Sequence, residues 1–136
     1  MIEFALAYPI LFLAMSGTFH FGYVFMTYDS LQTAIRAGSR FASLADFDGP
    51  DGTDFAEDVK DVVVYGKTDP DVGVDSPLVF GLTTEHVVVD SSDRDGSGMP
   101  ISVKVSISGF AINTFVDSYS LNSKPSSQFV YQGQFK

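Results

Sequence analysis

Acidic side chains are the residues of this chain best able to do chemistry, and they gather in three turn-rich clusters. The members are Asp46/Asp48/Asp51/Asp54, Asp69/Asp71/Asp75 and Asp90/Asp93/Asp95. Carboxylate oxygens are the ligands that Ca²⁺ prefers, and Asp46, Asp48 and Glu57 take the first, third and last positions of an EF-hand loop. Pro50 and Asp51 break that pattern, because Asp51 stands where the loop requires Gly. Ordinary turn chemistry accounts for all three clusters, so we expect no metal site.

The histidines and the missing catalytic motifs argue against an enzyme. His20 and His86 have no carboxylate or thiol partner at metal-ligand spacing, and the chain contains no Cys. We expect His20 to be a packed helix residue. No Gly-rich phosphate loop, GxSxG or HExxH motif occurs. The sequence therefore predicts no catalytic residue and no cofactor.

Glu3 is a lone carboxylate at the start of a strongly apolar segment. From Phe4 to Tyr28 the chain has 25 residues without Asp, Glu, Lys or Arg. A helix of that length is about 37 Å long and could span a bilayer with some tilt. A buried carboxylate is costly unless it is paired. Glu3 could therefore pair with the N-terminal amine of Met1 in a neighbouring copy, or it could stabilise the first helical turn at a membrane surface through the helix dipole.

The N-terminal flank lacks the Lys and Arg residues that usually orient an inserted segment. Basic residues normally mark the cytoplasmic side, yet the first one here is Arg36. The segment also lacks the positive leader and the cleavage site of a secretory signal peptide. Either a short basic leader preceded Met1 and was removed, or Met1 is the initiator.

The apolar segment continues without a break into an amphipathic pattern. Apolar or small residues recur at intervals of three and four, at Leu31, Ala34, Ile35, Gly38, Phe41, Ala42 and Ala45. This spacing predicts one helix over about residues 2–45, bent or locally opened at Pro9. Leu31, Ile35, Gly38 and Phe41 are expected to pack on a sheet.

Polar residues fall mostly on the opposite side of this predicted helix. They are Asp29, Gln32, Arg36, Ser39, Arg40 and Ser43. Arg36 and Arg40 could form salt bridges with other subunits. Alternatively, they belong to a solvated face that the helix dipole favours.

Residues 46–136 predict an acidic α+β domain. A short helix is expected from Asp54, with a capping box to Glu57, up to Gly66, and it should bury Phe55, Val59, Val62 and Val63. Strands are expected over residues 77–81, 85–90, 100–108 and 128–135, and residues 110–121 are interpreted as a short helix or a turn. In the strand over 100–108, Ile101, Val103, Val105 and Ile107 share one face. In the last strand, Phe129, Tyr131 and Phe135 do so. These strands predict an antiparallel sheet covered on one side by the helix.

Two N-terminal motifs resemble the TadE-like family of tight-adherence (Tad) type IV pilus proteins. They are EFALAYP over residues 3–9 and LQTAIRAGSRFA over residues 31–42. Residues 63–66 (VVYG), 77–89 (PLVFGLTTEHVVV) and 103–108 (VKVSIS) are similar to the C-terminal half of that family. The resemblance implies a pilin-like or pseudopilin subunit, made with a leader that a prepilin peptidase removes. Such proteins usually carry Glu at the fifth mature position, whereas here it is third.

The resemblance and the physical pattern together define the expected fold. It is a pilin-like α+β fold, in which a long N-terminal helix packs on a small antiparallel sheet domain. We divide the chain into an apolar transmembrane and filament-core helix (1–28), its amphipathic continuation (29–45) and the acidic globular domain (46–136).

The function implied is that of a structural subunit of an extracellular type IV/Tad-like pilus filament. Such a subunit would be held in the bacterial inner membrane and then polymerise through helix packing, with Met1 and Glu3 setting register. The core-packing residues would be Phe4, Leu6, Pro9, Leu11, Phe12, Leu13, Gly17, Phe19, Phe21, Gly22 and Phe25. Expected partners are copies of itself, other pilins and the inner-membrane assembly machinery.

Two further considerations bound this function. The alternative is a minor pseudopilin or membrane-anchored binding module that primes or caps assembly. The formal net charge of −9 excludes nucleic acid and makes anionic lipid headgroups poor partners.

Overall fold

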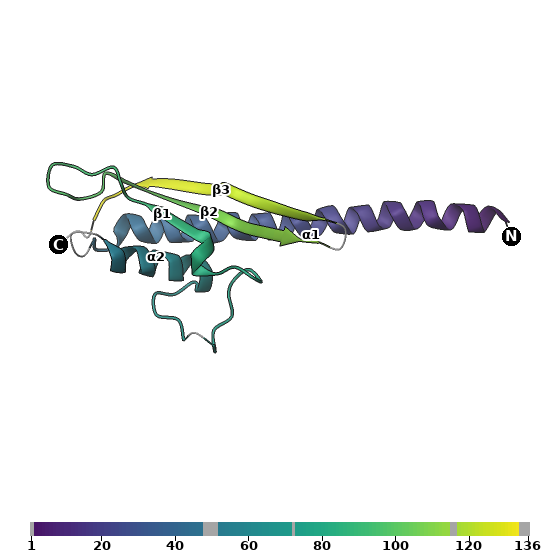
Figure 1. The fold of residues 1–136 in the computed structure, drawn as a ribbon, viewed down its shortest axis with the longest axis horizontal. Coiled ribbons are helices and arrows are strands. Elements are labelled where there is room, and N and C mark those ends of the chain that lie inside the picture. Colours follow the sequence, from purple (N-terminus) through teal and green to yellow (C-terminus); the bar gives the residue numbers. More distant parts are fainter. Residues whose placement is uncertain (1, 48–51, 72, 115–116, 134–136) are drawn as a thin grey trace.

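The computed structural model describes residues 2–47, 52–71, 73–114 and 117–133. Its elements are α1 (Ile2–Leu44), α2 (Thr53–Tyr65), the 3-10 turn η1 (Thr84–His86), β1 (Val87–Asp90), β2 (Ser102–Asn113) and β3 (Ser118–Val130). The predicted α+β class is confirmed, since a long N-terminal helix packs on a three-stranded antiparallel sheet (Figure 1).

Helix α1 is one element of 43 residues, and it continues through Pro9 without a break. At 1.5 Å per residue it is about 64 Å long. Its C-terminal half lies against the sheet and α2, whereas its N-terminal half extends beyond the rest of the molecule (Figure 1). One helix therefore serves two environments.

The sheet has the order β1-β2-β3, and both pairs are antiparallel. Val87 pairs with Ile107 and Val105 pairs with Ser127. The register of β2 and β3 shifts between Ser106 and Phe110, where Gly109 has a φ of 74° that few other residues adopt. This irregularity is typical of a β-bulge, which bends the hairpin locally.

The interpretation of residues 110–121 as a helix or turn was wrong. Phe110 and Ile112 are buried in the second half of β2, and Ser118 begins β3. The two strands form a long hairpin whose tip lies beside the middle of α1 (Figure 1). Phe115 and Phe135 lie outside the described residues.

The strand predicted over residues 77–81 was also wrong. Here the Leu78 N–H donates to the Val64 carbonyl at the end of α2 (2.7 Å), and the Leu82 N–H donates to Val79 (3.0 Å). The segment is a turn that buries Val79 and Leu82 while leaving Phe80 94% exposed. Its apolar composition reflects this packing, because apolar residues serve a buried turn as well as a strand.

Helix α2 begins two residues earlier than the predicted capping box from Asp54 to Glu57 requires. Gly52 is its N-cap, in the left-handed conformation (φ 61°), and no side chain caps the helix. Asp54 therefore lies inside the first turn, where the helix dipole favours it. The end at Gly66 is confirmed, since its N–H donates to the Val62 carbonyl (3.0 Å) with φ 79°.

The core lies where α1, α2 and the sheet meet. Leu31 and Ile35 of α1 are 0% and 1% exposed, and they belong to the same apolar cluster as Val63 and Val105. Ile101, expected on the inner face of its strand, is 48% exposed because β2 begins after it. Phe41 is partly buried against the core, and Phe129 is 41% exposed on β3.

Two serines assigned to the polar side of the helix are buried. Ser39 donates to the Ser127 carbonyl of β3 (3.4 Å), and Ser43 donates to the Arg40 carbonyl within α1 (2.8 Å). Small hydroxyls can be buried here because each finds an acceptor. They let β3 approach the helix closely.

Gly38 marks the closest approach of α1 and α2. A Cβ at this position would collide with a methyl group of Val63 and lie 3.6 Å from the Val59 carbonyl oxygen. Val63 is fully buried and β-branched, so it cannot move aside easily. The absence of a side chain at residue 38 therefore allows the two helices to pack.

Gly38→Ala is expected to lower the free energy of unfolding by about 1–3 kcal/mol through overpacking. Thermal or urea unfolding of the detergent-solubilised chain, followed by circular dichroism, measures this. Gly22→Ala is the matched control, because Gly22 lies on the same helix and a Cβ there would meet no atom within 4 Å. Equal stability of the two variants would contradict a tight crossing at Gly38.

Candidate assembly and membrane-anchoring site

The N-terminal half of α1 carries an apolar surface that the rest of the chain leaves uncovered. Eight of its large side chains are 63% to 85% exposed, namely Phe4, Leu6, Leu11, Phe12, Leu13, Phe19, Phe21 and Phe25. Residues 3–44 form a helix long and apolar enough to cross a membrane, near the N-terminus, and the apolar stretch itself is not buried in the chain. An apolar surface of this size needs lipid or protein neighbours.

Glu3 lies in the first turn of α1, at the end of the helix away from the globular part. Its side chain is exposed, and Met1, its predicted partner in register, lies outside the described residues. Within the described part of the chain the one salt bridge joins Lys67 Nζ and Asp75 Oδ2 at 2.5 Å. Any charge that pairs with Glu3 must therefore come from elsewhere.

The glycines and the proline of the stalk, the exposed N-terminal half of α1 from Glu3 to Met26, are open to neighbours. Gly17 and Gly22 have no atom within 4 Å of a Cβ built on them, and Pro9 is exposed. They leave room on the helix surface for another backbone or for lipid.

Arg36 and Arg40 both project from the exposed side of α1. Arg40 borders a shallow surface depression together with Phe41, Asp46 and Asp58. No salt bridge of either arginine occurs within the described residues. Both guanidinium groups therefore face outward.

The second and third acidic clusters are built by turn chemistry. Asp95 Oδ1 accepts hydrogen bonds from the Ser97 N–H and hydroxyl and from the Met99 N–H, at 2.9, 2.6 and 3.0 Å. The Asp75 carboxylate accepts from the Asp71 N–H at 2.7 Å. Among the described residues no three His, Asp or Glu side chains are placed to hold a metal ion, while Asp48 and Asp51 lie outside them.

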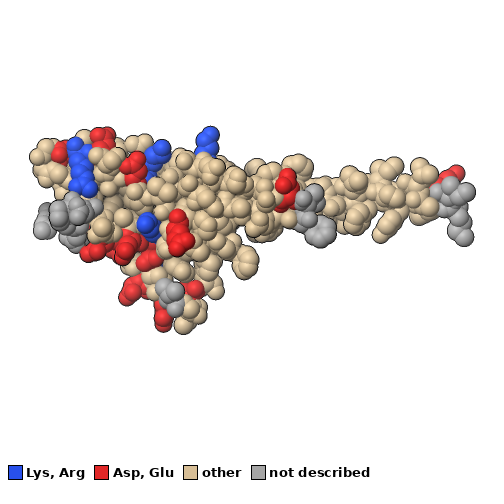
Figure 2. Space-filling view, viewed as in Figure 1, with Lys and Arg blue, Asp and Glu red and all other residues tan. Residues whose placement is uncertain are grey.

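Acidic side chains gather on one side of the globular part, including α2 (Figure 2). Desolvation by burial raises the pKa of Asp61, and the neighbouring charges of Asp58, Glu57 and Asp69 raise it further. In contrast, hydrogen bonds from Lys67 and from the Asp71 N–H lower the pKa of Asp75. The ionised form is therefore disfavoured at Asp61 and favoured at Asp75.

Asp61→Asn is expected to raise the melting temperature slightly at about pH 7, and this gain should shrink by about pH 3. A raised pKa means that ionised Asp61 opposes folding, and acid removes that charge from the unsubstituted chain as well. Asp75→Asn is the control of opposite sign. A lowered pKa means that ionised Asp75 stabilises the fold at pH values above the ordinary Asp pKa. Asp75→Asn should therefore lower the melting temperature at neutral pH and have little effect in acid. An equal rise in melting temperature at about pH 7 and at about pH 3 for Asp61→Asn would contradict the raised pKa of Asp61.

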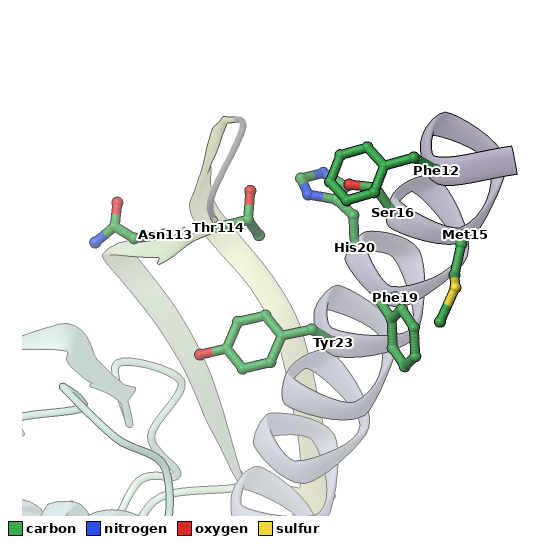
Figure 3. Close-up of a pocket in the computed structure, with 8 residues that line it drawn as sticks. All are labelled: Phe12, Met15, Ser16, Phe19, His20, Tyr23, Asn113 and Thr114. Carbon is green, nitrogen blue, oxygen red and sulfur yellow. The ribbon is translucent and has the colours of Figure 1, made fainter. Parts of the chain in front are cut away.

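The β2–β3 hairpin brings residues that sequence reasoning missed to the stalk. His20 Nε2 lies 3.4 Å from the Tyr119 hydroxyl, with the ring centroids 6.0 Å apart. A groove of about 590 Å³ opens between α1 and the hairpin tip (Figure 3). Its lining residues are Phe12, Met15, Ser16, Phe19, His20, Tyr23, Asn113 and Thr114. No sequence signal linked Tyr119 to His20, because 99 positions separate them.

His86 has a local structural role. Its Nδ1 lies 2.9 Å from the Thr83 hydroxyl and accepts from the Thr83 N–H (3.2 Å), while its ring meets the edge of Phe110. These contacts fix η1 ahead of β1.

An exposed apolar helical stalk joined to a small helix-and-sheet head defines a pilin-shaped protein. The family model described as TadE-like protein matches residues 1–40. Over these residues the chain is similar to TadE-like proteins, and the same segment contains the apolar helix that is long enough to anchor it in a membrane. A search of curated proteins and a search of solved structures each gave no match.

Proposed function

We propose that this protein is a structural pilin-like subunit that is anchored in the inner membrane by its N-terminal helix and then polymerises into an extracellular Tad-like filament. The observation that carries the proposal is the exposure of eight large apolar side chains in the stalk, 63% to 85% each. The head already has a core of its own, built from α1, α2 and the sheet. The stalk is therefore free to pack against other molecules.

The energetics favour this exchange of neighbours. Lipid tails are as apolar as Leu, so a transfer of the stalk from lipid to a bundle of stalks changes little hydrophobic free energy. Exposure to water would cost about 1.5–3 kcal/mol for each large side chain. A filament outside the membrane must then keep every stalk covered by neighbouring stalks, with Glu3 pairing to fix their register. The precursor would be a substrate of a prepilin peptidase, and the assembly machinery would supply the work of extraction.

Shearing of filaments from cells tests the proposal. The sheared fraction should contain this chain as a main component, alongside a membrane pool that has not assembled. The mass of the N-terminus in both fractions reports whether Met1 is the processed end. A chain found at high level in membranes and absent from sheared filaments would refute the filament role.

A second candidate is a minor pseudopilin or binding module that primes or caps assembly, and the loop after α2 favours it. Phe80 is 94% exposed and Val74 is 78% exposed in this loop. A protruding aromatic residue is typical of a binding anchor. Trace amounts at filament ends, together with loss of filaments on deletion, would select this candidate.

A further inference from the structure

We propose that the tip of the β2–β3 hairpin, defined here as residues 113–114 and 117–119, rests with His20 and Tyr23 of α1 in the headgroup layer of a zwitterionic phospholipid bilayer and limits how deeply the stalk inserts. This inference rests on the membrane-held stage of the proposed function. It adds a second contact with the membrane, made by the head rather than by the stalk.

The first argument is length. From Glu3 to His20 the helix rises about 26 Å, whereas a hydrocarbon core is about 30 Å thick. If the span begins at Phe4, the near boundary of the hydrocarbon falls close to Tyr23. Tyr119 at the tip of the hairpin contacts His20 of α1. The tip therefore reaches the bilayer surface before the helix has inserted the full thickness of the hydrocarbon core.

The second argument is polarity. Asn113, Asp117 and Ser118 are exposed at the tip, and β3 is an edge strand with free backbone groups. Unpaired backbone groups and carboxylates do not enter lipid-exposed hydrocarbon. These described tip residues must therefore stop in the headgroup layer, and the bilayer must thin locally to match the shorter span.

The third argument is the groove under the tip, which has two kinds of wall. Phe12, Met15 and Phe19 give its α1 wall an apolar character, while Asn113 and Thr114 lie on the hairpin side (Figure 3). Tyr23 and Tyr119 are 50% and 40% exposed beside it. Tyrosines are enriched where headgroups meet acyl chains. An apolar wall facing a polar one matches that boundary.

Single tryptophans measure the depth directly, because the natural chain has no Trp. The full chain is reconstituted into phosphatidylcholine vesicles that carry bromine either near the headgroup or near the ends of the acyl chains. Tyr119→Trp and Ser118→Trp place the probe at the tip. Both positions are exposed, so neither substitution removes core packing. Leu11→Trp probes the middle of the stalk, and Val130→Trp probes the exposed end of β3 that pairs with Ser102, at the opposite end of the hairpin from the tip.

The two tip probes are expected to lose fluorescence mainly to bromine near the headgroup. Leu11→Trp should lose it mainly to bromine near the chain ends, and Val130→Trp should lose none. Unquenched tip probes beside a quenched Leu11→Trp would overturn the inference while leaving the anchor intact, and cover of the groove by a second copy would give that result. Quenching of the tip mainly by deep bromine would overturn it as well. No quenching of Leu11→Trp would refute membrane insertion of the stalk itself.

Discussion

Leu31→Ala is expected to lower the free energy of unfolding of the head by about 2–5 kcal/mol, the range for Leu→Ala in a core. Leu31 is 0% exposed and lies where α1 meets the apolar cluster of α2 and the sheet. Truncation leaves a cavity that the surrounding strands and helix cannot fill completely. Total stabilities are only about 5–15 kcal/mol, so this one change could consume a large part of the total. Urea unfolding of the chain in detergent, followed by circular dichroism, measures the loss.

Leu13→Ala is the matched control, since it makes the same chemical change on the same helix. Leu13 is 76% exposed in the stalk, so the stability of the head should stay within about 0.5 kcal/mol of the unsubstituted chain. The contrast separates the two halves of α1 in one experiment. Similar losses for both substitutions would mean that the stalk also packs on the head.

The patterns of α1 and of the first half of β2 were readable because each obeys one period. Apolar residues at intervals of three and four, such as Leu31, Ala34 and Ile35, define a single helical stripe, and all three are buried. In β2 the alternation of Val103, Val105 and Ile107 defines one face, and these residues are fully buried. Strong periodicity followed by burial on one side is what sequence reasoning detects.

Strand β3 could not be recognised over most of its length, because it lacks a buried face. Nearly all its residues from Ser118 to Val130 are exposed or partly exposed, and Pro125 removes a backbone donor. An edge strand of Ser, Asn and Lys has no apolar alternation to reveal it. Its pairing with β2 depends on backbone hydrogen bonds, which leave little trace in the side-chain sequence.

The groove at the hairpin tip was beyond prediction for a related reason. It depends on the length of β2 and β3 and on the meeting of Tyr119 with His20. Pattern analysis placed Glu3 and the stalk residues on one helix, because the helical pattern is local to that segment. It could not predict the contact between Tyr119 and His20, because only the pairing of β2 with β3 and their packing on α1 bring these two residues together.

Glu3→Ala is expected to reduce incorporation into filaments by about 100-fold or more, while the level in the membrane changes little. In the proposed assembly Glu3 pairs with the amine of a neighbouring copy inside an apolar bundle. Removal of one partner of a buried ion pair costs about 3–5 kcal/mol, and about 1.4 kcal/mol corresponds to a tenfold change in an equilibrium. Quantitation of the chain in sheared filaments and in membranes measures both pools.

Asp29→Ala is the control for this substitution, because it removes a carboxylate from the same helix outside the apolar stalk. It should leave incorporation unchanged. Glu3→Asp keeps the charge but shortens the side chain, so an intermediate level is expected if distance to the neighbouring amine matters. Wild-type filament levels for Glu3→Ala would show that Glu3 serves only the helix dipole at the membrane surface. Register would then have to come from the shapes of the stalk side chains alone.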